Sequence, residues 1–255
     1  MIDTHTHIYA NDFASDQAEM VQRAVHAGVK LMLLPAIDAA SFEAMWQTAA
    51  NFPERVKPMI GLHPCSVNAD FETELNLVQR ELENNLEKYV AVGEIGIDLF
   101  WDKSTFQIQA EAFRRQLRWA KQYKLPVAIH SRNSFDEIFS ILEEEKTADL
   151  RGVLHCFTGG KRHVVKAREL GFYMGIGGVV TYAGSGVDHV LKRIELSEML
   201  LETDAPYLAP VPKKGERNEP SFLPYIAAKI AEIKGVSVEE VVEITTANAK
   251  KLFKL

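Results

Sequence analysis

The chain has 255 residues, of which 47% are hydrophobic and 25% are charged, and its formal net charge is −6. This composition suits a globular protein with a full core, and the acidic balance argues against a surface that coats nucleic acid broadly. The chain has two cysteines, Cys65 and Cys156, no leader of basic and then apolar residues, and no membrane-length apolar segment. We therefore expect a cytoplasmic protein without a disulfide framework, with no membrane contact and no required oligomer.

Short apolar segments, typical of β-strands, alternate along the chain with longer amphipathic segments. Strands are predicted over residues 1–7, 30–37, 56–62, 89–97, 125–131, 151–157, 172–179 and 199–205. Apolar residues at spacings of three and four predict helices over 14–28, 72–88, 109–124 and 135–146, and two or three more in the tail, 221–255. Ser15 and Gly28 are the predicted start and end of the first helix.

The strands themselves indicate the fold class. Several are too apolar for a sheet with one wet face, which favours parallel strands covered on both sides. Eight strand–helix units in about 250 residues predict an α/β fold of the (β/α)₈ TIM-barrel type, formed as a single domain over residues 1–255. A doubly wound open sheet is the main alternative.

Residue types that bind metals are placed at the carboxyl ends of the predicted strands, which form the catalytic face of a barrel. His5 and His7 end the first strand, and they face one side because residues i and i+2 of a strand do so. The others are His63 (third strand), Glu94 (fourth), His130 and Arg132 (fifth), His155 (sixth) and Asp204 (eighth). Imidazole and carboxylate donors together suit zinc, manganese or iron and, less well, magnesium.

Seven short motifs follow one another along nearly the whole chain: DTHTH, GLHP, GEIGID, HSR, HCFTG, ETDAPYL and RNEP. With them the chain resembles the TatD-type metal-dependent deoxyribonucleases of the amidohydrolase superfamily. The resemblance implies a centre of two divalent cations (Zn, Mn or Mg), in which His5, His7 and Asp204 hold one metal, His130 and His155 hold the other, and Glu94 bridges both. The pair Phe100 and Trp101 departs from the more polar stretch expected after GIDL.

Further residues near these motifs are assigned roles. Asp204 is the expected general base as well as a ligand. His63 is expected to donate to the substrate phosphate, or else to fix its loop, and Arg132 to stabilise phosphate charge. Glu202 and Asp3 either orient a ligand histidine or are buried structural partners.

A basic segment follows Asp204, and a thiol follows His155. Lys213, Lys214, Arg217 and Asn218 form either a loop that grips a phosphate backbone or an ordinary solvated loop. Cys156 is expected to be a packed thiol and not a nucleophile.

These features predict a phosphodiesterase acting on DNA. The resemblance implies a 3′-5′ exonuclease, and the preferred substrate is single-stranded DNA or frayed ends, because a barrel mouth is a pocket and not a long groove. One alternative is a hydrolase of the same superfamily that cleaves a small amide, lactone or phosphoester. Another is a metal-binding scaffold without turnover. Turnover of any substrate that is lost on chelation would show that the chain is an enzyme and not such a scaffold.

Overall fold

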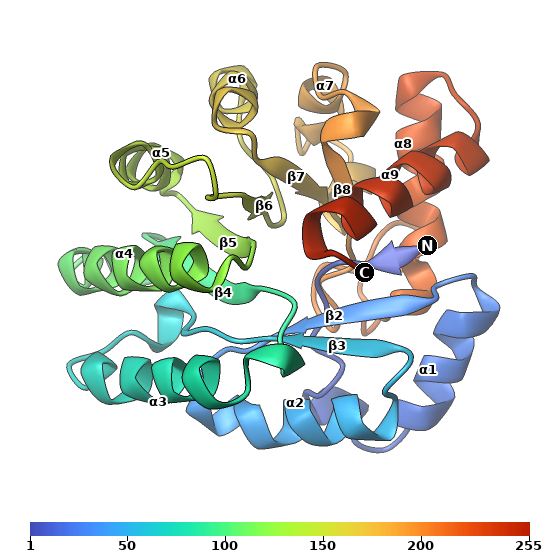
Figure 1. Ribbon diagram of the computed structural model, residues 1–255. Helices are drawn as coiled ribbons and strands as arrows, with labels where there is room; N and C mark the ends of the chain where they lie inside the picture. The colour runs from blue at the N-terminus through green and yellow to red at the C-terminus, as the bar shows by residue number, and fades with distance from the viewer.

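Eight parallel strands alternate with helices in the computed structural model, which describes residues 1–255 (Figure 1). The strands are β1 (Ile2–Asp3), β2 (Leu31–Pro35), β3 (Val56–Met59), β4 (Val92–Asp98), β5 (Val127–Arg132), β6 (Gly152–Leu154), β7 (Tyr173–Ile176) and β8 (Met199–Leu201). The helices are α1 (Gln17–His26), α2 (Ala39–Asn51), α3 (Phe71–Asn84), α4 (Phe106–Tyr123), α5 (Phe135–Glu144), α6 (Lys161–Leu170), α7 (Val187–Leu191), α8 (Leu223–Lys234) and α9 (Val238–Phe253).

The strands close into a ring, as predicted for a (β/α)₈ barrel. Hydrogen bonding joins β1–β2–β3 in one run and β4–β5–β6–β7–β8 in another. A parallel bridge between Ile60 and Val92 connects the two runs. The N–H of Thr4 donates to the carbonyl of Leu201 over 3.0 Å, which joins the first strand to the last.

Both faces of the strands are buried, which explains their apolar sequences. On β2, Met32 and Leu34 face the surrounding helices, and the intervening Leu33 faces the barrel interior. The interior cluster also includes Leu252 and Phe253 of α9. Helix α9 therefore covers the amino-terminal end of the barrel (Figure 1) and leaves the carboxyl-terminal end for a site.

Several element boundaries differ from the predicted ones. Helix α1 begins at Gln17 and not at Ser15, and it ends at His26, shortly before Gly28 with its φ of +87°. His5 and His7 lie beyond β1, because the regular ladder stops at Asp3. Glu94 lies inside β4, which extends to Asp98. No helix of the chain has the length and apolar character needed to span a membrane.

Candidate metal centre

A cavity of about 660 Å³ opens at the carboxyl ends of the strands. The predicted site residues that line it are His7, His63, Glu94, His130, Arg132, His155 and Asp204. His5 lies buried beside them, with its ring stacked on that of His155 at 3.5 Å. The barrel thus brings all eight predicted site residues together from six separate strands or the residues that follow them.

Glu94 lies at the middle of this cluster, and its two carboxylate oxygens face different histidines. Oε2 lies 3.1 Å from Nε2 of His5 and 3.7 Å from Nε2 of His7. The distances from Oε1 are 3.0 Å to Nδ1 of His130, 3.4 Å to Nε2 of His63 and 3.7 Å to Nε2 of His155. The register shift between Val92 and Ile95 on β4 accompanies this inward placement, and the N–H of Glu94 donates to the carbonyl of Ala36, the residue that follows β2.

Asp204 completes the first of these groups. Its Oδ1 lies 3.6 Å from Nε2 of His7, and 3.8 Å from Nε2 of both His5 and His155. His5, His7 and Asp204 are close enough together to hold one ion, and His63, Glu94 and His130 form a second such set. His155 lies between the two sets, within 3.8 Å of both carboxylates.

The charges in the cluster keep both central carboxylates ionised. Burial opposes the ionisation of Glu94, but the surrounding His5, His63 and His155 outweigh it and hold the pKa of Glu94 well below its usual range. Burial likewise opposes the ionisation of Asp204, and His155 leads the histidines that lower its pKa.

The residues present fit divalent cations. Imidazole nitrogens and carboxylate oxygens converge here, and this mixture of donors suits zinc, manganese or iron. The buried carboxylates of Glu94, Asp98 and Glu202 form ion pairs with histidines and with no lysine or arginine. Bound cations would therefore stabilise this cluster of buried carboxylates.

Comparison with known proteins agrees with this geometry. The sequence pattern of the family described as "TatD related DNase" matches residues 2–254. The chain belongs to this TatD family. It is therefore a metal-dependent hydrolase of ester bonds.

Relatives of the TatD family resemble the chain over its whole length. The "Uncharacterized metal-dependent hydrolase YabD" of Bacillus subtilis is 37% identical, over 100% of this chain and 99% of the relative. The "3'-5' ssDNA/RNA exonuclease TatD" of Citrobacter rodentium is 33% identical, over 99% and 97%. The crystal structure of YjjV, a TatD homologue from Escherichia coli, superposes with a TM-score of 0.94 at 33% identity, over 100% and 98%.

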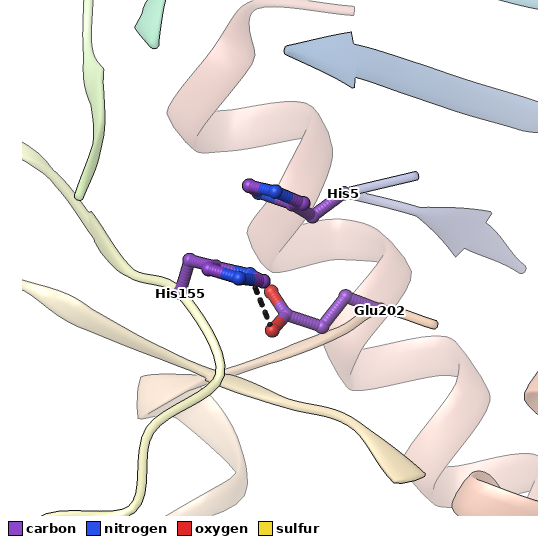
Figure 2. Close-up of side chains that lie close together, drawn as sticks. All are labelled: His5, His155 and Glu202. Atoms are coloured by element: carbon purple, nitrogen blue, oxygen red, sulfur yellow. Dashed lines mark ion pairs between the residues drawn. The ribbon is translucent and has the colours of Figure 1, made fainter. Parts of the chain in front are cut away.

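Glu202 orients His155 in this TatD-family centre. Its Oε1 lies 2.9 Å from Nδ1 of His155 (Figure 2) and also accepts the N–H of Cys156 over 2.5 Å. Burial would lower the pKa of His155, but the charges of Glu202 and Asp204 raise it to about 10. Gly175 makes room for this carboxylate, because a Cβ there would lie 2.1 Å from Oε2 of Glu202. The ring of His155 is thereby held with Nε2 towards the cavity.

Tyr9 sets the tautomer of His7, a contact that the sequence analysis missed. The Tyr9 hydroxyl donates its proton to the carbonyl of Pro35 over 2.7 Å. Its oxygen is then left to accept the Nδ1–H of His7 over 2.9 Å. Nε2 of His7 consequently keeps a free lone pair, which faces Asp204 and Glu94.

Replacing Tyr9 with phenylalanine is expected to weaken metal binding by about 10- to 100-fold, as loss of a ligand's hydrogen-bond partner does. The ring that packs in the core is kept, but His7 is free to adopt either tautomer. Zinc affinity measured by competition with a chromogenic chelator checks this. Tyr89→Phe is the matched control, because it removes another buried hydroxyl, one bonded to Trp46 and Glu81 away from the cavity. Equal zinc affinities for the two variants would contradict the assignment.

Asp98 is a second residue that the sequence analysis missed. Its Oδ2 lies 2.9 Å from Nε2 of His130, which leaves Nδ1 of that ring towards Glu94. Burial opposes its ionisation, but the hydrogen bond from His130 prevails and lowers the pKa of Asp98 to about 2. The available signal was its position in GEIGID, at the end of the strand that carries Glu94.

His63 and Asp3 have clear local roles. The N–H of Cys65 donates to Nδ1 of His63 over 3.1 Å, so a neutral His63 carries its proton on Nε2, which faces Oε1 of Glu94. Asp3 accepts hydrogen bonds from the backbone and hydroxyl of Thr203 and from the backbone of His5, and it touches no histidine ring. Asp3 is therefore the buried structural partner that ties β1 to the chain after β8.

Two charges of the basic segment after Asp204 have carboxylate partners. Arg217 pairs with Asp16 over 2.7 Å, and Lys213 pairs with Glu216 over 3.1 Å. Asn218 is buried and donates to the carbonyls of Thr203 and Tyr207, which fixes the loop that carries Asp204. The ion pairs of Arg217 and Lys213 favour the ordinary solvated loop. Lys214 lies over the ring of Tyr182 and has no carboxylate partner, so the phosphate-binding loop stays a prediction from the sequence.

Cys156 lines the cavity beside His155, and burial leads the effects that raise its pKa well above the ordinary thiol value. A thiol held protonated is a poor nucleophile, in agreement with the predicted packed thiol.

Proposed function

We propose that this chain is a two-metal deoxyribonuclease that removes nucleotides from the 3′ end of single-stranded DNA or of frayed duplex ends. The observation that carries the proposal is the placement of Glu94, whose two oxygens face two separate sets of ligand-type side chains. The exonuclease relative from Citrobacter rodentium supports the same substrate class.

The ligand assignment is the one that the resemblance implies, and the distances of these side chains to Glu94 and Asp204 support it. His5, His7 and Asp204 would hold one cation, and His130 and His155 the other, with Glu94 shared between them. When bound, such cations neutralise phosphate charge and lower the pKa of water.

The chain's own residues supply the remaining chemistry. Asp204 lies at the cavity with a carboxylate that stays ionised, so it can accept the proton of an attacking water molecule. The guanidinium of Arg132 lines the same cavity and can stabilise negative charge that develops on the phosphate. The Nε2–H of His63 is available as a hydrogen-bond donor to a phosphate oxygen.

The shape of the site favours strand ends. The cavity is enclosed by loops at one end of a closed barrel, and it contains a single arginine and no lysine. Few phosphates can be neutralised there at once, so the salt dependence of binding should be shallow. A single strand can bend its last nucleotide into such a pocket, whereas a stacked duplex must first fray.

End dependence can be tested with two single-stranded DNAs of one sequence, one linear and one covalently closed. With metal present, the linear strand should shorten stepwise from its 3′ end while the circle survives. Labels placed at either end of the linear strand report the polarity, and an RNA of the same sequence reports the sugar preference. Equal loss of the circle and the linear strand would make the enzyme an endonuclease and contradict the proposal.

Other features remain predictions from the sequence: one domain over residues 1–255, a cytoplasmic location and no required oligomer. The alternative substrates, a small amide, lactone or phosphoester, are addressed by the same assays, because hydrolysis of those compounds without loss of DNA would favour them.

A further inference from the structure

Two aromatic side chains stand exposed at the mouth of the cavity. Phe100 and Trp101 follow β4, and their exposed fractions are 50% and 71%. Trp101 lines the cavity itself. An apolar surface of this kind beside a catalytic cavity indicates a binding role. The metal centre described above does not use either ring.

The aromatic pair is tied to the metal centre through one carboxylate. Oδ1 of Asp98 accepts the N–H of Phe100 over 2.9 Å and that of Trp101 over 3.4 Å. Its other oxygen contacts His130. The backbone at Trp101 is therefore held close to the ligand His130.

The guanidinium of Arg132 lies against the two aromatic rings. The guanidinium carbon of Arg132 lies 3.8 Å from the ring centre of Phe100 and 5.3 Å from that of Trp101. Arg132 forms no ion pair with a carboxylate, unlike Arg217 and Arg23. Its charge is thus held at the cavity by stacking and is free to meet an anion.

The rim of the cavity on the β8 side, opposite Phe100 and Trp101, is formed by other side chains. Tyr207 and Leu208, which follow β8, also line the cavity and are 53% and 39% exposed. In a ring of eight strands β4 and β8 are four positions apart, so the two rims face each other across the mouth. A flat group that enters on the β4 side can rest on Trp101 while its attached phosphate points down to the centre.

We propose that Trp101 and Arg132 form a subsite in which the nucleobase of the 3′-terminal nucleotide stacks on the indole and an adjacent phosphate meets the guanidinium. This inference rests on the proposed function, and it names the part of the substrate that the rim recognises. Every base can stack on an indole. The subsite therefore requires that the terminal nucleotide carry a base and be unpaired, but it does not select a sequence. Phe100 supports Arg132 from behind.

Binding is measured with a single-stranded oligonucleotide whose end linkages are phosphorothioates, which resist hydrolysis. Trp101→Ala should weaken binding by about 5- to 150-fold, the usual effect of removing one base-stacking ring. Trp101→Phe should restore most of the affinity. Tyr225→Ala is the control, because Tyr225 is an aromatic residue on α8 that is 40% exposed and does not line the cavity. An affinity in Trp101→Ala equal to that of the control overturns the proposal.

A cycle that combines Trp101→Ala with loss of one base identifies the stacking partner. The unaltered chain and Trp101→Ala are each tested with an intact oligonucleotide, one abasic at its 3′-terminal nucleotide, and one abasic five nucleotides inward. The terminal abasic site should reduce the binding affinity of the unaltered chain as much as Trp101→Ala does. The two changes together should reduce the affinity little further. Fully additive losses, or coupling to the inner position, would contradict the assigned partner.

Intrinsic fluorescence supplies an independent signal. Trp119 is buried and Trp46 packs against the core, and neither lines the cavity, so Trp101 is the tryptophan that a bound base can quench. Quenching by the oligonucleotide should disappear in Trp101→Phe although binding persists. Quenching that is retained there would count against the subsite.

Failure of the subsite and failure of the proposed function give different results. If the unaltered chain hydrolyses methyl p-nitrophenyl phosphate but neither binds nor shortens DNA, the proposed nuclease function fails, and the subsite with it. If it shortens DNA normally and Trp101→Ala does so with an unchanged KM, the subsite alone fails.

Discussion

Asp204→Asn is expected to reduce kcat by at least about a hundredfold, the usual effect of losing general-base help. The amide has nearly the shape of the carboxylate but cannot accept a proton from water. Asp204 also has a φ of +58°, in the left-handed region, where asparagine is well tolerated and alanine is strained. Asparagine therefore tests the chemistry with the backbone undisturbed.

The measurement for Asp204→Asn is kcat on a linear oligonucleotide, together with metal content and the thermal unfolding temperature. Asp149→Asn is the control, because Asp149 is exposed on the loop before β6 and does not line the cavity. Turnover near that of the unaltered chain, at full metal loading, would show that Asp204 is not the base.

Glu94→Gln is expected to lower metal affinity by at least about a hundredfold, and turnover with it. Loss of a residue that hydrogen-bonds to a metal ligand lowers metal affinity by about 10- to 100-fold. Loss of Glu94, a ligand that faces both sets of ligand-type side chains, should lower it by at least about 100-fold. Glutamine offers one oxygen, and its NH₂ group would face one set of histidines whichever way the amide turns.

Metal content after dialysis, measured by elemental analysis, checks the prediction for Glu94→Gln. Glu87→Gln, a surface change before β4, is the control and should bind metal as the unaltered chain does. Two metals per chain in the control and fewer than one in Glu94→Gln is the expected pattern. Two tightly held metals in both would mean that Glu94 does not bridge.

The sequence was informative about the ligands because the barrel obeys simple geometry. Parallel strands that close into a ring bring their carboxyl ends together, so the histidines of DTHTH and the aspartate of ETDAPYL had to meet once eight strands were recognised. Glu94 was placed at a strand end, whereas it lies inside β4, where a register shift accompanies its inward placement. Such a shift depends on neighbouring backbones and leaves no mark in the hydrophobic pattern.

The supporting contacts could not be predicted for a related reason. Tyr9 reaches His7 only because its own proton is used by Pro35 of the next strand. Arg217 pairs with Asp16, 201 residues earlier in the chain, and no spacing in the sequence indicates that pair. Partner choice among polar side chains is a property of the tertiary structure, and composition or spacing does not specify it.

The closure of the barrel also constrains when activity can arise during synthesis. Thr4 bonds to Leu201, 197 residues later, and the amino-terminal end of the barrel is covered by α9, which follows all eight strands in the chain. Long-range closures of this kind form late, and nascent chains emerge amino terminus first. A ribosome-bound chain thus carries His5 and His7 long before it has Asp204 or the cover for its apolar interior. The hydrolytic centre is therefore incomplete in any chain that stops before Asp204, and hydrolysis can begin only after β8 and the residues beyond it have been made.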